Sequence, residues 1–347
     1  MFAMTVRGPV AADELGIVLP HEHLFIDLRN QFTPVADPEE DRLSRQPVSA
    51  DNLGRLRQNP YAVRDNLVLD DLETAVREVE EFRRLGGRTI VDCTSVGIRR
   101  NVTALRELAE RTGLHILAGC GHYTHDTHPA EMDRWSAADV AAQMIRDLRE
   151  GADGTDIKAG VIGEIGTSDP VHANEWKALE AAALAHRGTA AAVYVHAYPW
   201  GRRGLEAAEF LVKKGVRAEK IAVCHTDVAP DVEHILALLR AGVFVEFDNF
   251  GKEFQISQEV RGFAGGGFAR DVDRVRLLKR LVDAGYARQL LITNDICLKC
   301  LLRHFGGGGY AHILRDIVPM LESEGVDAGT IDMLLRGNPR RLLAAPV

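Results

Sequence analysis

The sequence predicts an α/β fold, a (β/α)8 TIM barrel in which eight parallel strands are each followed by a helix. Short apolar, β-branched runs alternate with longer segments of helical periodicity along the whole chain, which is typical of repeated βα units. We count eight such units, and eight strands close into a barrel more readily than into an open sheet. The 347 residues, of which 46% are hydrophobic and 27% charged, suffice for one large core. We therefore expect a single domain over residues 1–347.

The predicted strands are short apolar runs, as expected for strands buried on both faces. They cover Gly16–Pro20, Thr89–Asp92, His115–Gly119, Gly160–Glu164, Ala192–His196, Ile221–His225, Val243–Phe247 and Leu290–Thr293. The predicted helices lie between the strands and have apolar residues at helical spacing. They cover Leu72–Leu85, Val102–Thr112, Ala137–Leu148, Glu175–His186, Leu205–Lys214, Val232–Leu239, Val272–Asp283 and Ala311–Glu322. Residues 1–14 precede the first strand, and we expect a hairpin there that covers the barrel floor.

Three long connections follow predicted strands, at residues 27–66, 252–270 and 296–310. Loops of this length in a compact domain usually act as lids or binding loops, and those that follow barrel strands lie at the catalytic face. The first contains several prolines and many charges, so we expect irregular structure there. The third contains the glycine run 306–309, which lacks the Lys-Ser/Thr of a phosphate-binding P-loop, and we interpret it as a flexible turn.

Charge and hydropathy limit the classes of partner. A formal net charge of −8 disfavours nucleic acid and anionic membranes, because phosphate binding depends on clustered Lys and Arg. The N-terminus lacks the apolar region of a secretory signal, and no run of about 18 apolar residues could span a bilayer. We therefore expect a cytoplasmic protein that acts on small molecules, without nucleic-acid or membrane partners. A homodimer is compatible with the sequence.

The five cysteines are odd in number and scattered, which favours free thiols in a reducing compartment over a disulfide framework. Cys297 and Cys300 form a single CxxC pair. A zinc ribbon needs a second pair, and a thioredoxin-like motif opens a helix after a strand. We interpret the pair as ordinary thiols near a loop.

The strongest chemical signal is Pro20-His21-Glu22-His23 at the end of the first strand. Positions i and i+2 of a strand project to the same face, so His21 and His23 should point together toward the barrel axis. Two neutral imidazoles there suit a borderline-soft divalent metal. Taken alone, two histidines at this spacing are more often a coincidence, or a pair with ordinary hydrogen-bond partners, than a metal site. Its place at the C-terminal end of a barrel strand favours metal binding.

Four more metal-binding side chains stand at equivalent positions of other strands. Glu164 ends the fourth strand, His196 the fifth and His225 the sixth, whereas Asp295 follows the eighth. Each has an ordinary structural alternative, such as an ion pair or a turn, but the tops of the strands converge on one small volume. Four histidines and two carboxylates exceed what one tetrahedral zinc needs, so the count predicts two metals.

In these motifs the chain resembles the phosphotriesterase-like branch of the amidohydrolase superfamily. The resemblance covers nearly the whole chain and rests on Leu15–His23, Thr89–Ser95, Gly119–Tyr123, Gly160–Glu164, Val195–His196, Cys224–Asp227, Thr293–Asp295 and Asn338–Leu343. It implies that His21, His23 and Asp295 bind the more buried metal, and that His196 and His225 bind the more exposed one. Zinc is the first expectation for both, with Mn²⁺ or Co²⁺ as alternatives.

Glu164 departs from a common feature of that family. Many members bridge the two metals with a carboxylated lysine at the end of strand four, where this chain has Gly163-Glu164-Ile165-Gly166. A glutamate side chain is shorter than a lysine carbamate, so the bridge requires strand four to lie closer to the axis or the metals to shift. Gly163 and Gly166 permit such an adjustment. Some relatives use glutamate here, and we expect Glu164 to bridge.

The expected nucleophile is a hydroxide between the two metals, because a shared water has a pKa lowered to around 7. Asp295 would hold this hydroxide and accept its proton. For substrate binding we predict Tyr123 and Phe250, with Lys252 and Arg303 as cations for an anionic group. An apolar entrance is suggested by Phe247, Phe250, Phe254, Phe263 and Phe268.

We therefore predict a metal-dependent hydrolase of carboxylic esters or lactones, with organophosphate or phosphonate ester hydrolysis as a related activity. A dedicated phosphotriesterase or phosphodiesterase is one alternative, because it would use the same nucleophile in a pocket of different shape. A non-catalytic binder of lipophilic small molecules is another, but a pure binder has no reason to keep Asp295 beside a complete metal set. A mononuclear deaminase-type barrel is a third, and it would bind a single metal.

Overall fold

The computed structural model describes residues 1–34, 37–256 and 262–345, which form a (β/α)8 barrel. Eight strands form one parallel sheet in the order β12-β11-β10-β9-β8-β7-β6-β3. The two strands at the ends of this order meet, since the Thr293 hydroxyl oxygen, just after β12, lies 3.1 Å from the carbonyl oxygen of His21 on β3. The fold class predicted from the sequence is confirmed.

The barrel strands lie close to the predicted segments. Their bounds are β3 (Ile17–Glu22), β6 (Gly87–Asp92), β7 (His115–Cys120), β8 (Val161–Thr167), β9 (Val193–Ala197), β10 (Ile221–Val223), β11 (Phe244–Phe247) and β12 (Leu290–Ile292). β10 and β12 end earlier than predicted because His225 and Asp295, just beyond them, have positive φ angles of 61° and 50°. Two predicted site residues therefore lie on sharp turns at the strand ends.

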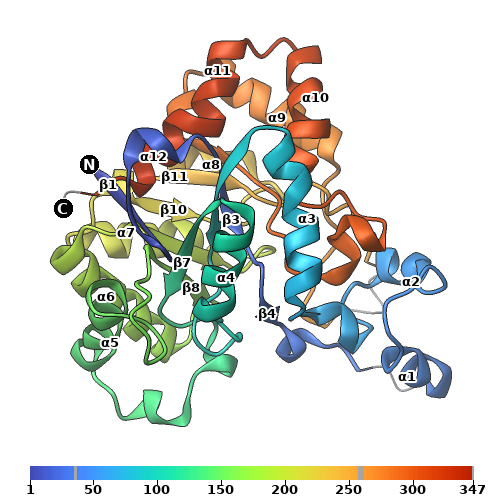
Figure 1. Cartoon of the computed structure of the whole chain (residues 1–347), viewed down its shortest axis with the longest axis horizontal. Helices are drawn as coiled ribbons and strands as arrows, with labels where there is room; N and C mark the ends of the chain where they lie inside the picture. The colour runs from blue at the N-terminus through green and yellow to red at the C-terminus, as the bar shows by residue number, and fades with distance from the viewer. Residues whose placement is uncertain (35–36, 257–261, 346–347) are drawn as a thin grey trace.

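Helices cover the outside of the barrel (Figure 1). Within the described ranges, none of them is long and apolar enough to cross a bilayer. Ser136 caps α5 in a reciprocal pair with Asp139, as expected for a helix start. The predicted helix Ala311–Glu322 is divided into a π-helical turn, Ile313–Ile317, and α10, where Pro319 lacks an amide hydrogen. The helix bounds are α3 (Leu72–Arg84), α4 (Val102–Thr112), α5 (Ala137–Arg149), α6 (Ala173–Thr189), α7 (Gly204–Lys213), α8 (Val232–Arg240), α9 (Asp271–Asp283), α10 (Val318–Ser323), α11 (Ala328–Asp332) and α12 (Asn338–Leu343).

An N-terminal hairpin lies at the bottom of the barrel. β1 (Phe2–Thr5) and β2 (Gly8–Ala11) pair antiparallel, and the Val6 amide donates to the carbonyl oxygen of Ile116, near the start of β7, at 2.8 Å. Phe2 also pairs with Ala345, so this hairpin lies beside α12 (Figure 1). The hairpin thus covers the N-terminal ends of the strands, and the opposite face carries the long connections.

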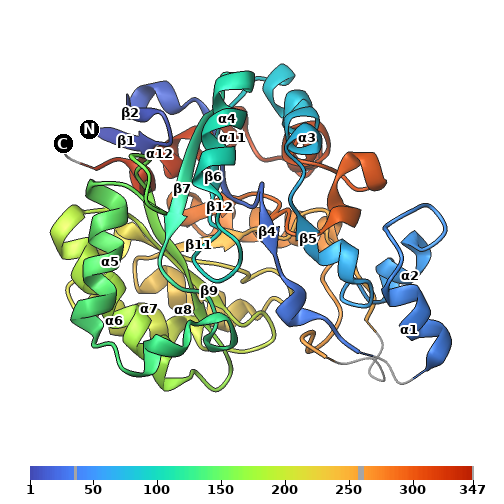
Figure 2. The same ribbon diagram turned by 60° about the horizontal axis from the view of Figure 1, so that its bottom comes forward.

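The connection at residues 27–66 is only partly irregular. It contains α1 (Pro38–Ser44) and α2 (Leu53–Gln58), which stand out together at one side of the molecule (Figures 1 and 2). Asp37 begins α1 by accepting hydrogen bonds from two amides of the first turn. The expectation of irregular structure overlooked this capping aspartate. Within the second predicted mouth loop, residues 257–261 lie outside the described residues.

The glycine run 306–309 is a tightly packed turn rather than a flexible one. Gly306 and Gly309 have φ angles of 90° and 67°, which side chains rarely adopt. A Cβ at Gly307 would lie 2.1 Å from the carbonyl oxygen of Leu301, and one at Gly308 would lie 2.7 Å from the His312 ring. Backbone conformation therefore requires glycine at 306 and 309, and lack of space for a side chain requires it at 307 and 308.

Candidate metal centre

Six side chains with metal-binding atoms converge at the C-terminal mouth of the barrel, and all of them are buried. Five of them lie at or just after the ends of β3, β9, β10 and β12, whereas Glu164 lies inside β8, which continues to Thr167 and does not end at Glu164 as predicted. Carbonyl and amide partners of the barrel sheet fix the main chain at each end, so the side chains project into one volume. The residues are His21, His23, Glu164, His196, His225 and Asp295.

Glu164 lies at the centre of this group. Its Oε1 is 3.5 Å from His23 Nε2, and its Oε2 is 3.7 Å from His21 Nε2. The same Oε2 is 3.2 Å from His196 Nδ1 and 3.3 Å from His225 Nε2. One carboxylate therefore faces all four histidines, which is the placement that a shared ligand of two metals requires.

Glycines allow β8 to bring Glu164 this far inward. A Cβ at Gly163 would lie 2.5 Å from the carbonyl oxygen of Tyr194 on β9, and Gly163 has a φ of 122°. A Cβ at Gly166 would lie 2.2 Å from the amide nitrogen of Thr124. Since any side chain at these positions would push β8 away from its neighbours, the glycines compensate for the short reach of a glutamate.

The remaining distances divide the group into two halves. His23 Nε2 lies 3.1 Å from Asp295 Oδ1, and His21 Nε2 lies 3.8 Å from the same oxygen. On the other side, His196 Nδ1 lies 2.8 Å from His225 Nε2. The first half comprises His21, His23 and Asp295, and the second comprises His196 and His225, with Glu164 between them.

The outer ring nitrogens of three histidines are occupied, which leaves the inner nitrogens directed at the centre. His21 Nδ1 lies 2.9 Å from Glu246 Oε2, and His23 Nδ1 lies 2.9 Å from Thr94 Oγ1. His225 Nδ1 lies 3.1 Å from Asp248 Oδ2. Such outer partners fix the tautomer and orientation of metal-binding imidazoles.

Two buried inner atoms, His21 Nε2 and Asp295 Oδ1, have no hydrogen-bond partner among the described residues. Burial disfavours the charged form of His21, but Glu164 and Glu246 outweigh it and raise its pKa to about 10. This shift reports a strongly negative potential at the centre, which divalent cations would neutralise. The donor set, its unpaired atoms and its potential all fit divalent metals held by nitrogen and oxygen ligands.

Glu246 and Asp248, on and just after β11, are site residues that the sequence reasoning missed. They stand at positions i and i+2, the same spacing that identified His21 and His23, so both point into the barrel. Burial raises the pKa of Glu246 to about 7, and it remains the partner of His21 Nδ1. Cys224 lies in the same group, and burial raises the pKa of its thiol well above its usual value.

Asp295 is held by Glu22, the central residue of the His-Glu-His motif. The buried Glu22 Oε1 accepts hydrogen bonds from the Thr293 hydroxyl at 2.5 Å and from the Asn294 amide and side chain, both at 2.9 Å. Its Oε2 accepts from the Ile296 amide at 2.8 Å. Glu22 therefore fixes the residues on both sides of Asp295.

Asp295 Oδ2 forms an ion pair with Lys252, which follows β11. Burial alone would raise the pKa of Asp295, but Lys252 and the neighbouring histidines hold it well below its usual value. Burial alone would lower the pKa of Lys252, but Asp295 raises it. Both groups are therefore charged at neutral pH.

A small cavity of about 40 Å³ opens beside the six residues. Of the predicted substrate-binding residues, Tyr123 and Lys252 line it, together with Tyr61, Phe263 and Phe268. The structure does not bring the other two there. Phe250 is fully buried in the hydrophobic core, and Arg303 forms an ion pair with Glu81 on α3. Phe247 is also in the core, and Phe254 lines a different pocket.

The Tyr123 hydroxyl lies 3.3 Å from His196 Nε2 and accepts a hydrogen bond from Gln31 Nε2 at 3.1 Å. Burial raises the pKa of Tyr123 well above its usual value, so the phenol stays protonated. If His196 Nδ1 offers its lone pair to the centre, Nε2 carries the hydrogen and donates to Tyr123. The hydroxyl hydrogen of Tyr123 then remains available to a molecule in the cavity.

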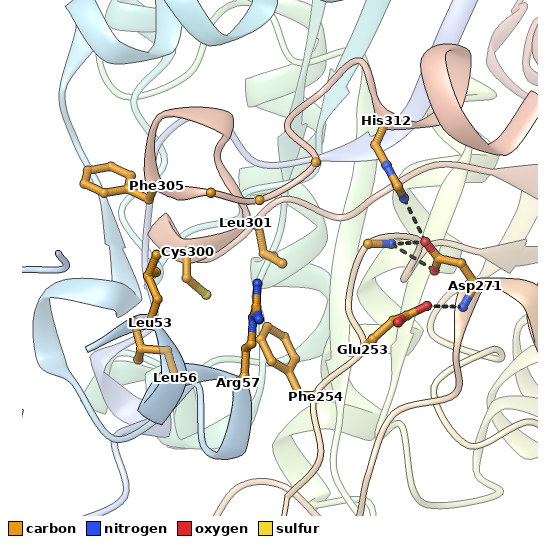
Figure 3. Close-up of a pocket in the computed structure, with 14 residues that line it drawn as sticks. Leu53, Leu56, Arg57, Glu253, Phe254, Asp271, Cys300, Leu301, Phe305 and His312 are labelled. Atoms are coloured by element: carbon orange, nitrogen blue, oxygen red, sulfur yellow. Dashed lines mark hydrogen bonds and ion pairs between the residues drawn. The ribbon is translucent and has the colours of Figure 1, made fainter. Parts of the chain in front are cut away.

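A larger pocket of about 520 Å³ lies on the other side of the segment that carries Lys252 (Figure 3). Gly251, Glu253 and Phe254 line it, whereas Lys252 faces the small cavity. Figure 3 shows Asp271 between His312 and Glu253: it accepts from His312 Nε2 at 2.7 Å, and its amide donates to Glu253 at 2.7 Å. The two predicted CxxC thiols separate, because Cys297 lines the small cavity and Cys300 the larger pocket.

Comparison with known proteins agrees with this architecture. The sequence model of the phosphotriesterase family matches residues 1–343. The chain is 37% identical to an N-acetyltaurine hydrolase from Danio rerio over 98% of this chain and 97% of that protein. It is 35% identical to a resiniferatoxin-binding protein from Rhodobacter sphaeroides, whose crystal structure matches with a TM-score of 0.94 over 99% of this chain and 94% of that one. A mutant PTE-like lactonase from Deinococcus radiodurans matches with 27% identity and a TM-score of 0.77, over 99% of this chain and 100% of that one. The chain belongs to the phosphotriesterase family.

Proposed function

We propose that this protein is a binuclear metal-dependent hydrolase that cleaves a carboxylic acyl bond in a small molecule. The observation that carries the proposal is the position of Glu164 between two groups of ligand atoms, beside a cavity that other polar side chains enter. His21, His23 and Asp295 would hold one cation, and His196 and His225 the other. Zinc is the first candidate, because imidazole and carboxylate ligands suit it.

Two such cations would supply Lewis acidity at the scissile group and a water with a lowered pKa. Asp295 is placed to accept a proton, because its buried Oδ1 faces the centre, 3.1 Å from His23 Nε2 and 3.8 Å from His21 Nε2. Glu22 and Lys252 hold its main chain and its second oxygen, so the accepting atom is oriented before substrate binds.

Tyr123 is suited to donate a hydrogen bond to the substrate's carbonyl oxygen as negative charge develops there. Its oxygen receives hydrogen bonds from Gln31 and, in the metal-binding tautomer, from His196, so its own hydrogen points elsewhere. Because the cavity is buried, one such donor is worth more than it would be in water.

An N-acyl amide with a short acyl group is the leading substrate class. Relatives at up to 37% identity over nearly the full chain are named N-acetyltaurine hydrolase, and N-acetyltaurine is an acetamide of an aminosulfonate. Esters and lactones are the second class, supported by the lactonase names of structural relatives, and they require the same attack on an acyl carbon.

Non-catalytic binding of a lipophilic ligand is the second candidate, because one structural relative is named for resiniferatoxin binding. A pure binder has no need of an ionised Asp295 beside a complete set of metal-binding side chains, which favours hydrolysis.

The test is turnover by the zinc- or manganese-loaded protein of N-acetyltaurine, aryl acetates, simple lactones and aryl phosphotriesters. We expect hydrolysis of at least one acyl substrate and its loss when a chelator removes the metal. Clear phosphotriester turnover without any acyl turnover would replace the proposal with a dedicated phosphotriesterase. Turnover that survives complete metal removal would refute the metal-dependent mechanism.

A further inference from the structure

Lys252 is the only lysine or arginine among the described residues that line the active-site cavity. Its side chain is 5% exposed, and its Nζ contacts Asp295 and lies 3.5 Å from Cys297 Sγ. An ammonium carries three N–H donors, and these contacts account for two of them. The third donor is left for an acceptor inside the cavity.

The direction of Lys252 is fixed by the main chain on both sides. The Gly251 amide donates to the Asp271 carboxylate at 3.0 Å, and the Lys252 carbonyl oxygen accepts from Arg274 at 3.1 Å. Arg274 is fully buried and also pairs with Asp227 at 2.9 Å. These contacts send Lys252 toward the cavity while its neighbours line the larger pocket behind it, as Figure 3 shows for Glu253.

The other polar groups at the cavity cannot recognise a negative charge as well. Gln31 is a neutral donor and already bonds Tyr123. The Asn249 side-chain amide is committed to Asp227 and Asp248. A buried ammonium, in contrast, gives a short charge-assisted hydrogen bond to an anionic oxygen.

We propose that Lys252 is a specificity-determining residue that selects substrates with a sulfonate or carboxylate close to the scissile acyl bond. This inference rests on the proposed acyl hydrolysis, since it names the substrates of that same site. The anionic group would accept the third N–H of Lys252 while the ion pair with Asp295 persists. Substrate charge would then be recognised next to the residue that accepts the proton.

A purely structural role, in which Lys252 only orients Asp295, makes a different prediction. Loss of an orienting residue would slow the hydrolysis of charged and neutral substrates alike, through kcat. Loss of a charge-recognising residue would weaken the binding of anionic substrates alone, through KM. The ratio of kcat/KM for the anionic substrate to kcat/KM for its neutral analogue therefore distinguishes the two roles of Lys252.

The experiment compares wild type, Lys252→Met, Lys252→Gln and Lys252→Arg, each loaded with zinc. One substrate pair is N-acetyltaurine and its neutral methyl sulfone analogue; the other is 3-acetoxypropanoate and its neutral amide, 3-acetoxypropanamide. We expect Lys252→Met to lower the preference for the anionic member by roughly 10- to 100-fold, the loss of one charge-assisted hydrogen bond, with most of the change in KM. Lys252→Arg should retain part of the preference.

Lys214→Met is the matched control, because Lys214 also forms an ion pair, with Glu180 at 2.6 Å, but lies between outer helices. It should keep the wild-type preference. Calorimetric binding of propane-1-sulfonate, compared with ethyl methyl sulfone, gives a readout that does not need turnover. The sulfonate should bind wild type at least tenfold more tightly than Lys252→Met or Lys252→Gln.

Equal losses for charged and neutral substrates in Lys252→Met, or equal binding of the sulfonate by wild type and variant, would overturn the inference. If the proposed acyl hydrolysis itself is wrong, the wild type will hydrolyse none of the four substrates. In that case the sulfonate titration alone still decides whether Lys252 binds an anion.

Discussion

Replacement of Glu22 by glutamine tests whether the centre of the His-Glu-His motif positions Asp295. The Glu22 carboxylate accepts four hydrogen bonds from Thr293, Asn294 and Ile296. A glutamine can place its carbonyl oxygen where Oε1 accepts three of them, but its NH₂ group then faces the Ile296 amide, which is also a donor. One buried N–H is left unsatisfied, which costs about 1–3 kcal/mol. We expect the free energy of unfolding to fall by that amount and Tm by a few degrees.

The same substitution should reduce catalysis, because Ile296 adjoins Asp295. A displacement of about 1 Å at a catalytic group can cost on the order of 100-fold in rate. We therefore expect Glu22→Gln to lower kcat by about 10- to 100-fold with less than a threefold change in KM. The assay is steady-state kinetics on the metal-loaded protein, together with thermal unfolding.

Glu78→Gln is the matched control, because the buried Glu78 accepts hydrogen bonds from the amides of Arg303 and His304, both at 2.8 Å, away from Asp295. It should lower Tm by a similar amount and leave kcat unchanged. A Glu22→Gln protein with reduced Tm but wild-type kcat would refute the positioning role. Unchanged Tm would refute the hydrogen-bond reasoning itself.

Three further predictions concern single residues. Asp295→Asn should retain most bound metal but lose turnover by about 100-fold or more, and full activity would remove Asp295 from the mechanism. Burial disfavours charged His312, but hydrogen bonds to two carboxylates outweigh it and raise its pKa. Its stabilisation is therefore complete below the unfolded pKa and is lost as pH rises through the raised value. The Tm difference between wild type and His312→Asn should be larger near pH 6 than near pH 9, and a constant difference would contradict this. Gly166→Ala should lower stability by about 1–3 kcal/mol, because its methyl group would lie 2.2 Å from the Thr124 amide nitrogen; an unchanged unfolding midpoint would contradict the close packing of β8.

The positions of the barrel elements could be predicted because each strand is a short apolar run and each helix has apolar residues at helical spacing. Their ends were harder to predict where they matter most. His225 and Asp295 have positive φ angles, which non-glycine residues rarely adopt and which no local pattern encodes. Contacts from other strands stabilise these turns, such as the hydrogen bonds from the His225 amide to Asp248.

Histidines at strand ends were easier to recognise than carboxylates at equivalent positions. The chain contains 13 histidines but 50 aspartates and glutamates, so a pair of histidines two residues apart is the rarer event. Glu246 and Asp248 have the same spacing as His21 and His23 and were missed for this reason. Their role depends on the imidazole rings of His21 and His225, which come from other strands.

The direction of loop side chains could not be predicted, because contacts distant in sequence determine it. Lys252 enters the cavity since Arg274 and Asp271 on α9 hold the main chain around it. Phe250, two residues earlier, points into the core instead. Arg303 lies in a mouth loop as expected, but its ion pair with Glu81 directs it away from the cavity.

The number of divalent metal ions per chain can be measured by elemental mass spectrometry on purified wild type and Glu164→Gln, and it decides whether Glu164 is shared by two metals. We expect two equivalents of divalent metal in the wild type, because Glu164 faces both groups of histidines. We expect one equivalent or less in Glu164→Gln, since the shared carboxylate is lost while the fold is kept. One equivalent in the wild type, unchanged in Glu164→Gln, would contradict a binuclear centre bridged by Glu164.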